Sequence, residues 1–244
     1  GANRFIKDKY NWNCIMIASV WFRKDVINTI LNYPSNIPSA KEILLFNRDV
    51  HGRNVFTYAC RIGNIDFIIF LLDKNFNINE KDVYGWTALM YAIVRNNFDV
   101  VELLFKNNVK LNIKNNDGET ELILASIQGY LEIVKLLLLN GSDINSADEN
   151  GHSALIHAVK KGHINIINEL LSNMFILINK NDNKGCNALI YACINQNVEI
   201  VKLLLINGAL INKQDYKGLN AFMYVCINGN LDIFKLLIDR SLID

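Results

Sequence analysis

The chain has 244 residues, of which 51% are hydrophobic and 20% charged. It therefore holds enough apolar material for a folded core and lacks the composition of a disordered protein. A formal net charge of only +1 argues against a nucleic-acid-binding protein, which normally shows a strong basic excess.

The sequence also argues against a membrane or secreted protein. The apolar run from Cys14 to Phe22 is followed directly by Arg23 and Lys24, which is not the pattern of a secretory leader. No apolar run approaches the ~18 residues that a membrane helix needs. We therefore expect no direct membrane insertion and a cytoplasmic location, with the nucleus as an alternative.

The N-terminal part of the chain predicts a degenerate helical hairpin over residues 11–47. The phrase NWNCIMIA begins at Asn11, and residues 26–31 form the expected second helix. Pro34 and Pro38 lie in the long join from Asn32 to Asn47. They predict an extended loop there, because proline disfavours helical structure at its own position and at the residue before it. We expect this hairpin to cap the N-terminal end.

A phrase of eight residues recurs along the rest of the chain at a period of 33 or 34 residues. Its copies include GWTALMYA and GCNALIYA, and they begin at Gly52, Gly85, Gly118, Gly151, Gly185 and Gly218. A second phrase keeps the same register, as in IVKLLLLNGSDIN from Ile133 and IVKLLLINGALIN from Ile200. The repeats therefore begin near residues 49, 82, 115, 148, 182 and 215.

Each repeat predicts two helices. The first phrase predicts a short helix and the second a longer amphipathic one, because their apolar residues recur at helical spacing. A Gly or Asn between them allows the chain to turn back. Neither helix can bury its apolar face alone, so the hairpins must stack around a shared core. We expect one elongated domain over residues 1–244.

The period and the phrase Thr87-Ala88-Leu89-Met90-Tyr91-Ala92 resemble the ankyrin repeat, which has 33 residues and the motif T-P-L-H-x-A. The Pro and His of that motif are absent from every unit. The chain resembles the ankyrin-repeat family over nearly its whole length. This resemblance implies an all-α fold, an ankyrin-repeat solenoid of stacked helix-turn-helix units with finger loops.

The resemblance also implies where a partner binds. Family members usually contact partners through the finger loops, which flank each starting Gly, and through the palm, which is the end of each first helix. The corresponding finger residues are His51, Arg53, Tyr84, Trp86, Asp117, Glu119, His152, Lys184 and Lys217. The corresponding palm residues are Arg61, Val94, Arg95, Gln128, Lys160 and Lys161.

Three of these residues form the strongest predicted contact site. Tyr84, Trp86 and Arg95 place aromatic area and a cation in one repeat, and such residues dominate interaction hot spots. The alternative is that Trp86 packs sideways on the neighbouring finger. The finger charges alternate in sign along the chain, which predicts a partner with a complementary mixed pattern.

Other recurrent residues are interpreted as structural. The Asp three residues before most starting glycines can accept hydrogen bonds from the turn's own amides; these are Asp49, Asp82, Asp148, Asp182 and Asp215. An Asn after each second helix can bond loops of adjacent repeats; these are Asn79, Asn112, Asn145, Asn179 and Asn212.

Three further features allow two interpretations. Tyr58, Tyr91, Tyr191 and Tyr224 share one helical position, which favours packing between repeats with the hydroxyl in water over an exposed aromatic ladder. Cys60, Cys193 and Cys226 share another and are expected to be small core residues. The fifth repeat is one residue longer around Phe175. We expect Phe175 to be buried; if exposed, it would form a secondary contact site.

No sequence motif for catalysis is present. The chain lacks phosphate-binding, dinucleotide-binding, zinc-protease and serine-hydrolase motifs. His152 and His157 could share a ligand or a proton, but without a carboxylate pair at a metal-like spacing we expect no metal site. The five cysteines contain no CxxC pair, which indicates reduced thiols. We therefore expect no enzyme activity, no catalytic residues and no cofactor.

Taken together, these features predict a scaffold or adaptor that binds another protein or peptide and is a monomer in isolation. The alternative is a substrate-recognition or regulatory segment of a larger enzyme, such as an ankyrin-bearing palmitoyltransferase, or of a microbial effector.

Overall fold

The computed structural model describes residues 5–21, 23–32, 40–74 and 76–241. Within these residues the regular structure is helical, apart from two isolated bridges, so the predicted all-α class is confirmed. The chain divides into two compact units, residues 1–116 and 117–244. That residues 1–244 form one continuous domain stays a prediction.

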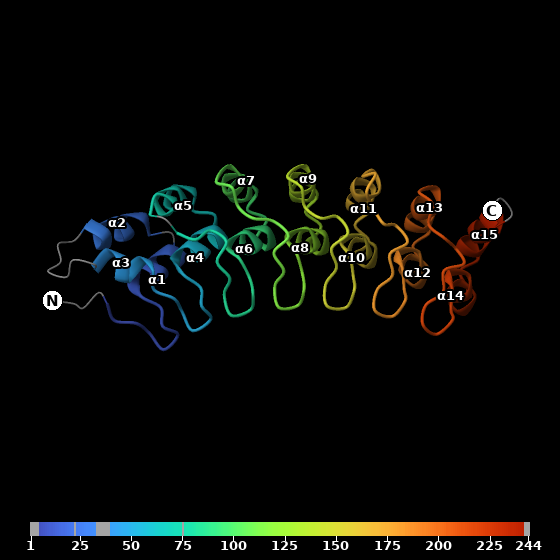
Figure 1. Cartoon of the computed structure of the whole chain (residues 1–244), viewed down its shortest axis with the longest axis horizontal. Coiled ribbons are helices and arrows are strands. Elements are labelled where there is room, and N and C mark those ends of the chain that lie inside the picture. The colour runs from blue at the N-terminus through green and yellow to red at the C-terminus, as the bar shows by residue number, and fades with distance from the viewer. Residues whose placement is uncertain (1–4, 22, 33–39, 75, 242–244) are drawn as a thin grey trace. The chain divides into compact units, whose positions relative to one another are not determined.

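The described residues of the first unit form three helical hairpins and one additional short helix (Figure 1). Its helices are α1 (Cys14–Val20), α2 (Lys24–Asn32), α3 (Ala40–Leu45), α4 (Val55–Ile62), α5 (Ile65–Leu72), α6 (Ala88–Val94) and α7 (Phe98–Lys106). The first helices α1, α4 and α6 contact one another in chain order, and each also contacts the second helix of its own hairpin.

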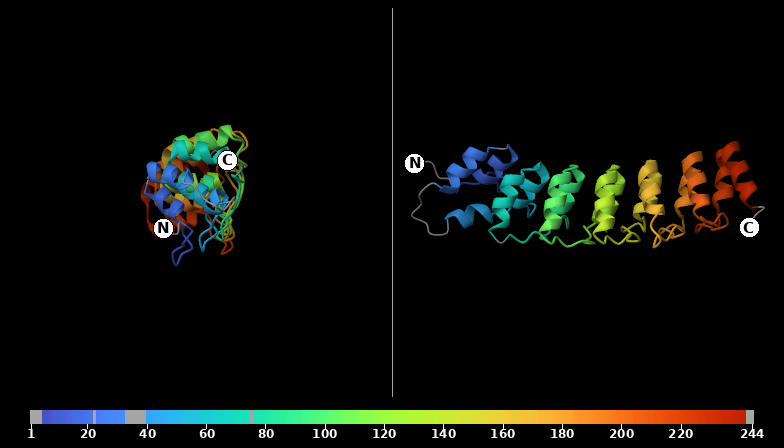
Figure 2. Two further views of the ribbon diagram at one scale, coloured as in Figure 1. Left: turned by 90° about the vertical axis from the view of Figure 1, so that its left-hand side faces the viewer. Right: turned by 90° about the horizontal axis from the view of Figure 1, so that it is seen from above.

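In the second unit, the part of the chain that the structure describes forms four hairpins. Its helices are α8 (Glu121–Gln128), α9 (Leu131–Leu139), α10 (Ala154–Lys161), α11 (Ile164–Leu171), α12 (Ala188–Ile194), α13 (Val198–Ile206), α14 (Ala221–Asn228) and α15 (Leu231–Ser241). Successive first helices contact one another, and Figure 2 shows the second helices of this unit side by side. The loops that join the hairpins project beyond the first helices, away from the second helices (Figure 1).

The first helices begin and end at residues that the sequence marks clearly. The Thr87 hydroxyl accepts a hydrogen bond from the Met90 amide, which satisfies an otherwise unpaired group at the helix start. Equivalent caps occur at Asn13, Asn54, Thr120, Ser153, Asn187 and Asn220. Several of these helices end at a glycine in the left-handed region, as at Gly63 with φ of 90°.

The core lies between the two layers of helices in each unit. In the hairpin of α6 and α7, the side chains of Leu89, Ile93, Val101 and Leu104 are fully buried. Burying each such side chain stabilises the fold by roughly 1.5–3 kcal/mol. Because α6 contacts α4 of the preceding hairpin as well as α7 of its own, the stacking that the sequence predicts completes the core.

The N-terminal hairpin is present, but the join after it differs from the prediction. An extended loop was expected from Asn32 to Asn47, whereas residues 40–45 form α3. The helix forms because Leu44 and Leu45 are buried where α3 contacts α1. Pro34 and Pro38 lie outside the described residues.

Two other core predictions need correction. Cys60 and Cys193 are buried as expected, but Cys226 is exposed, since no first helix follows α14 among the described residues. Phe175 is 71% exposed rather than buried. Its loop is held by Asn145, whose amide donates to the Phe175 carbonyl, and the extra residue leaves the side chain at the surface.

Candidate functional site

In five repeats the finger loop is held by the aspartate that opens the repeat. Oδ1 of Asp82 accepts hydrogen bonds from the backbone amides of Tyr84 and Trp86, both at 2.9 Å. The same pair of bonds occurs at Asp49, Asp148, Asp182 and Asp215. The interpretation of these carboxylates as structural residues is therefore confirmed.

The second oxygen of the same aspartate binds the recurrent tyrosine. The Tyr58 hydroxyl donates to Asp49 Oδ2 at 2.7 Å. Tyr91, Tyr191 and Tyr224 make the same bond to the aspartate nine residues before them. The prediction that these hydroxyls reach water is wrong, because a neighbouring carboxylate accepts them. Burial, together with this bond, raises the pKa of Tyr58.

Backbone hydrogen bonds join neighbouring finger loops within each unit. In the first unit, the Val83 amide donates to the His51 carbonyl, and the Asn116 amide donates to the Tyr84 carbonyl, both at 2.9 Å. In the second unit, the Tyr216 amide donates to the Lys184 carbonyl at 3.0 Å. The fingers therefore form a fixed framework that presents side chains to solvent.

The recurrent asparagines join the loops that follow the second helices of neighbouring repeats. Asn179 accepts a hydrogen bond from the Leu210 amide and donates to the Gly208 carbonyl. Asn145 bonds the next loop in the same way, and Asn79 accepts from the Lys110 amide. The predicted role of this asparagine position is confirmed at these three residues.

The predicted hot spot in the first unit is only partly exposed. Tyr84 is 49% exposed, and its hydroxyl lies 3.0 Å from Nδ1 of His51. Trp86 is half-buried because its ring packs against Tyr91, with 5.2 Å between ring centroids. Trp86 therefore packs within its own repeat, and Tyr84 offers the accessible aromatic surface. Arg95 is exposed at the end of α6.

Arg53, another predicted contact residue, is engaged by a structural partner within its own repeat. The Arg53 guanidinium donates to Asp49 Oδ2 at 2.8 Å through Nε and forms an ion pair with it at 2.7 Å. Burial alone would raise the pKa of Asp49, but the bonds from Arg53 and Tyr58 outweigh it and lower that pKa. The palm residues Arg61 and Val94 are half-buried.

The second unit presents mainly polar and cationic predicted residues. The exposed ones are Asp117, Gln128, Lys160, Lys161, Lys184 and Lys217, and Glu119 is half-buried. His152 requires a correction: the residue is only 7% exposed, so it offers little surface to a partner. It is buried because it packs edge-on against Tyr191, with 5.7 Å between ring centroids.

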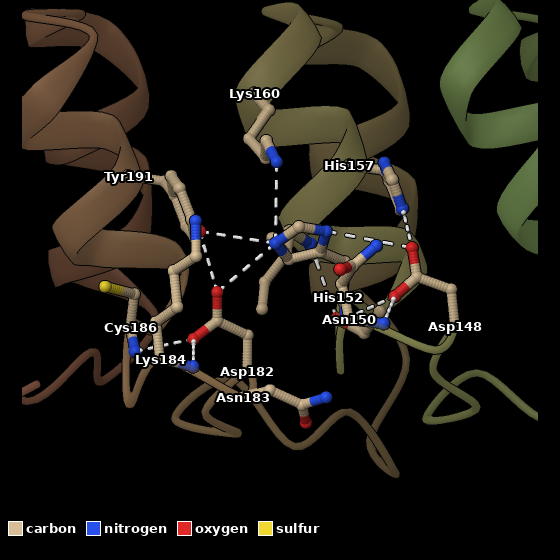
Figure 3. A network of polar contacts seen from close by, with 12 residues as sticks. Asp148, Asn150, His152, His157, Lys160, Asp182, Asn183, Lys184, Cys186 and Tyr191 are labelled. Carbon is tan, nitrogen blue, oxygen red and sulfur yellow. Dashed lines mark hydrogen bonds and ion pairs between the residues drawn. The ribbon is translucent and has the colours of Figure 1, made fainter. Parts of the chain in front are cut away.

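His152 instead lies at the centre of a polar network (Figure 3). Its Nε2 lies 3.2 Å from both Asp182 Oδ2 and the Tyr191 hydroxyl, and 3.4 Å from Lys160 Nζ. Burial is the main cause that lowers the pKa of His152, and the positive charge of Lys160 lowers it further.

On its other side the network reaches the aspartate of the same repeat. His157 Nε2 lies 2.9 Å from Asp148 Oδ2, where four other repeats place a tyrosine hydroxyl. Burial is also the main cause that lowers the pKa of His157. The sequence interpretation assigned Asp148 only to the turn and missed its contact with His157. The spacing of Asp148, His152 and His157 within one repeat was the sequence signal for this cluster.

Within the described residues, no helix has the length and hydrophobicity of a membrane-spanning segment.

Comparison with protein families gives a consistent result. A family model described as ankyrin repeats in three copies matches residues 35–115 and 122–215. A second, described as ankyrin repeats in many copies, matches residues 197–238. Repeats of this kind are generally protein–protein interaction modules. None of the curated proteins compared with the chain matches it.

Proposed function

Because this chain belongs to the ankyrin-repeat family, we propose that it is a non-catalytic scaffold or adaptor that holds a partner protein or peptide on its finger loops and palm. The observation that carries the proposal is the contrast between a fixed frame and varied exposed residues. Each finger aspartate fixes the loop backbone, as Asp82 does for Tyr84. The exposed side chains on that frame differ from repeat to repeat.

In the first unit, the proposed contact surface is formed by Tyr84 and Arg95. Both are exposed, and the finger that carries Tyr84 is held by backbone bonds on both sides. Binding therefore requires little ordering of the loop, which reduces the entropic cost of association. Trp86 packs against Tyr91 within the same repeat and is therefore proposed to stabilise this surface rather than to contact the partner.

In the second unit, the proposed contacts are electrostatic. Four exposed lysines, Lys160, Lys161, Lys184 and Lys217, favour acidic groups of a partner, and Asp117 favours a basic one. Such exposed charges mainly set the association rate and specificity. Affinity should therefore fall as ionic strength rises.

The experiment compares two surfaces of the first unit. A partner is first captured from cells by the chain, identified and purified. It is then titrated against the wild-type chain and against a Tyr84→Ala/Arg95→Ala variant. The control is an Asp99→Ala/Lys106→Ala variant, which changes exposed positions of α7. Hot-spot truncation costs ~2 kcal/mol or more, so the first variant should lose binding about tenfold or more. Loss in the control alone would place the contact on the second helices and refute the proposed surface.

The chain is further proposed to act in the cytoplasm or nucleus and to be a monomer in isolation; the alternative to a separate adaptor is a substrate-recognition or regulatory segment of a larger enzyme or of a microbial effector. Light scattering tests the monomeric state. The reading frame on either side of this sequence tests whether the chain works alone.

A further inference from the structure

The repeat that begins near residue 148 differs from its neighbours in its ionisable residues. In four other repeats the residue nine positions after the finger aspartate is tyrosine, whereas here it is His157, and a second histidine, His152, lies on the finger. An imidazole can replace the tyrosine hydrogen bond, but it is also the commonest side-chain ligand for metal ions. Two imidazoles and a carboxylate thus meet in one repeat.

The three side chains converge at the spacing that a metal ion needs (Figure 3). Asp148 Oδ2 lies 2.9 Å from His157 Nε2 and 3.7 Å from His152 Nδ1, and one ligand atom from each residue lies within 4.8 Å of the others. Around a tetrahedral zinc ion, with bonds of about 2.0–2.2 Å, ligand atoms lie about 3.4 Å apart. Small side-chain rotations achieve this spacing.

The second ring nitrogen of His152 is also placed as in metal sites. His152 Nε2 lies 3.2 Å from Asp182 Oδ2, and metal-bound histidines usually donate their other N–H to a carboxylate. With the proton on Nε2, the lone pair of Nδ1 faces Asp148 Oδ2. A cation between these two acceptors makes that arrangement favourable.

The opposite tautomer is the competing arrangement. In it, His152 Nδ1–H points toward Asp148 and Nε2 accepts from Lys160 Nζ, which lies 3.4 Å away. A metal ion would select the first tautomer. Lys160 opposes a cation, but it approaches the Nε2 edge of the ring, and two carboxylates, Asp148 and Asp182, outnumber this one ammonium group. The side chains of Asp148 and His157 are 5% and 13% exposed, so the negative charge of Asp148 is only partly screened by solvent.

From this geometry we propose that Asp148, His152 and His157 bind one divalent transition-metal ion of the zinc class. Three protein ligands leave a fourth position for water or for a side chain of a bound partner. Asp148 and His152 lie on the finger loop and His157 lies on α10. The ion would therefore fasten the finger to the first helix, and it would stabilise the second unit without any partner.

The test uses the whole chain, freed of metal by a chelator, with zinc chloride titrated calorimetrically. Wild type should bind one ion and melt at a higher temperature with zinc than without it. His157→Tyr restores the residue that four other repeats carry, so it should fold normally and show no detectable binding. Asp182→Asn removes the charge beside His152 and should weaken binding by about 10- to 100-fold. His51→Gln, in the first unit, should bind as wild type does.

Cobalt binding provides a second, spectroscopic readout. Cobalt held by nitrogen and oxygen should give weak visible bands that disappear in His157→Tyr, whereas cysteine ligation gives intense thiolate charge-transfer absorption in the near ultraviolet. The proposal is overturned if wild type binds no ion stoichiometrically, if His157→Tyr binds zinc with unchanged affinity, or if the cobalt complex shows thiolate ligation.

Discussion

The Tyr58 hydroxyl donates a 2.7 Å hydrogen bond to Asp49 Oδ2, while Oδ1 of the same carboxylate accepts the amides of His51 and Arg53. One aspartate therefore links the finger loop to α4. Because the bond recurs in other repeats, the fingers are rigid parts of the fold. They present side chains without first having to become ordered.

Removing this hydroxyl should destabilise the first unit. Tyr58 is fully buried, so Tyr58→Phe leaves its ring packing unchanged but deprives Asp49 of a donor. Hydrogen bonds to charged groups contribute about 1.5–3 kcal/mol, and we expect a loss of the free energy of unfolding in that range, measured by urea denaturation. Tyr216→Phe is the control, because Tyr216 is 79% exposed. Equal effects of the two substitutions would contradict the argument.

The Asp49 carboxylate should also make stability depend on pH. Its pKa is lowered in the folded chain, where bonds from Arg53 and Tyr58 outweigh the effect of burial. A lowered carboxyl pKa stabilises the fold above the unfolded value of about 3.9, and this stabilisation is lost as pH falls through the folded value. The stability difference between wild type and Asp49→Asn should therefore be largest near pH 6 and shrink toward pH 3. A difference that stays constant with pH would show that Asp49 acts without its charge.

Much of this fold can be predicted from the sequence, because the same constraints recur in every repeat. The glycine period, the capping residues and the apolar positions are enough to identify the hairpins. The prediction failed where a contact depended on a partner far along the chain. Leu44 and Leu45 form a helix only because α1 covers them, and Cys226 is exposed because no first helix follows α14 among the described residues.

The candidate sites were harder to predict, because exposure and pairing depend on side-chain geometry. The finger position carries no sign that His152 is buried or that Arg53 is bound to Asp49. The Asp–Tyr contact, in contrast, leaves a trace in the sequence. The repeat that begins near residue 115 has Asn115 in place of the finger aspartate and Leu124 in place of the tyrosine, so both positions differ in that repeat. That pattern indicates a direct contact between them.

Glycine is expected to be required at the finger turn for two reasons: its left-handed backbone conformation and the close approach of the next finger. Gly185 has φ of 82°, and a Cβ there would lie 2.8 Å from the Tyr216 backbone nitrogen. Gly141 has φ of 86° but no atom within 4 Å of its Cβ position. Gly141→Ala should cost only the left-handed backbone penalty of about 1–2 kcal/mol. Gly185→Ala should cost clearly more, since the next finger must move. Thermal denaturation of both variants measures the difference, and equal costs would show that the fingers are not closely packed.

Cysteine labelling should report which repeats are covered. Burial raises the pKa of Cys193 to about 12 and, as the main cause, that of Cys186 to about 11. Both thiols are buried, so each lacks access as well as the reactive thiolate form. Cys226 is exposed on α14 and should be the first of these three to react with a thiol reagent near pH 7.5. Cys226→Ser should remove that fast phase, whereas Cys193→Ser should leave it unchanged. If Cys193 reacted as fast as Cys226 in the folded chain, α12 and α14 would not be stacked as the structure shows.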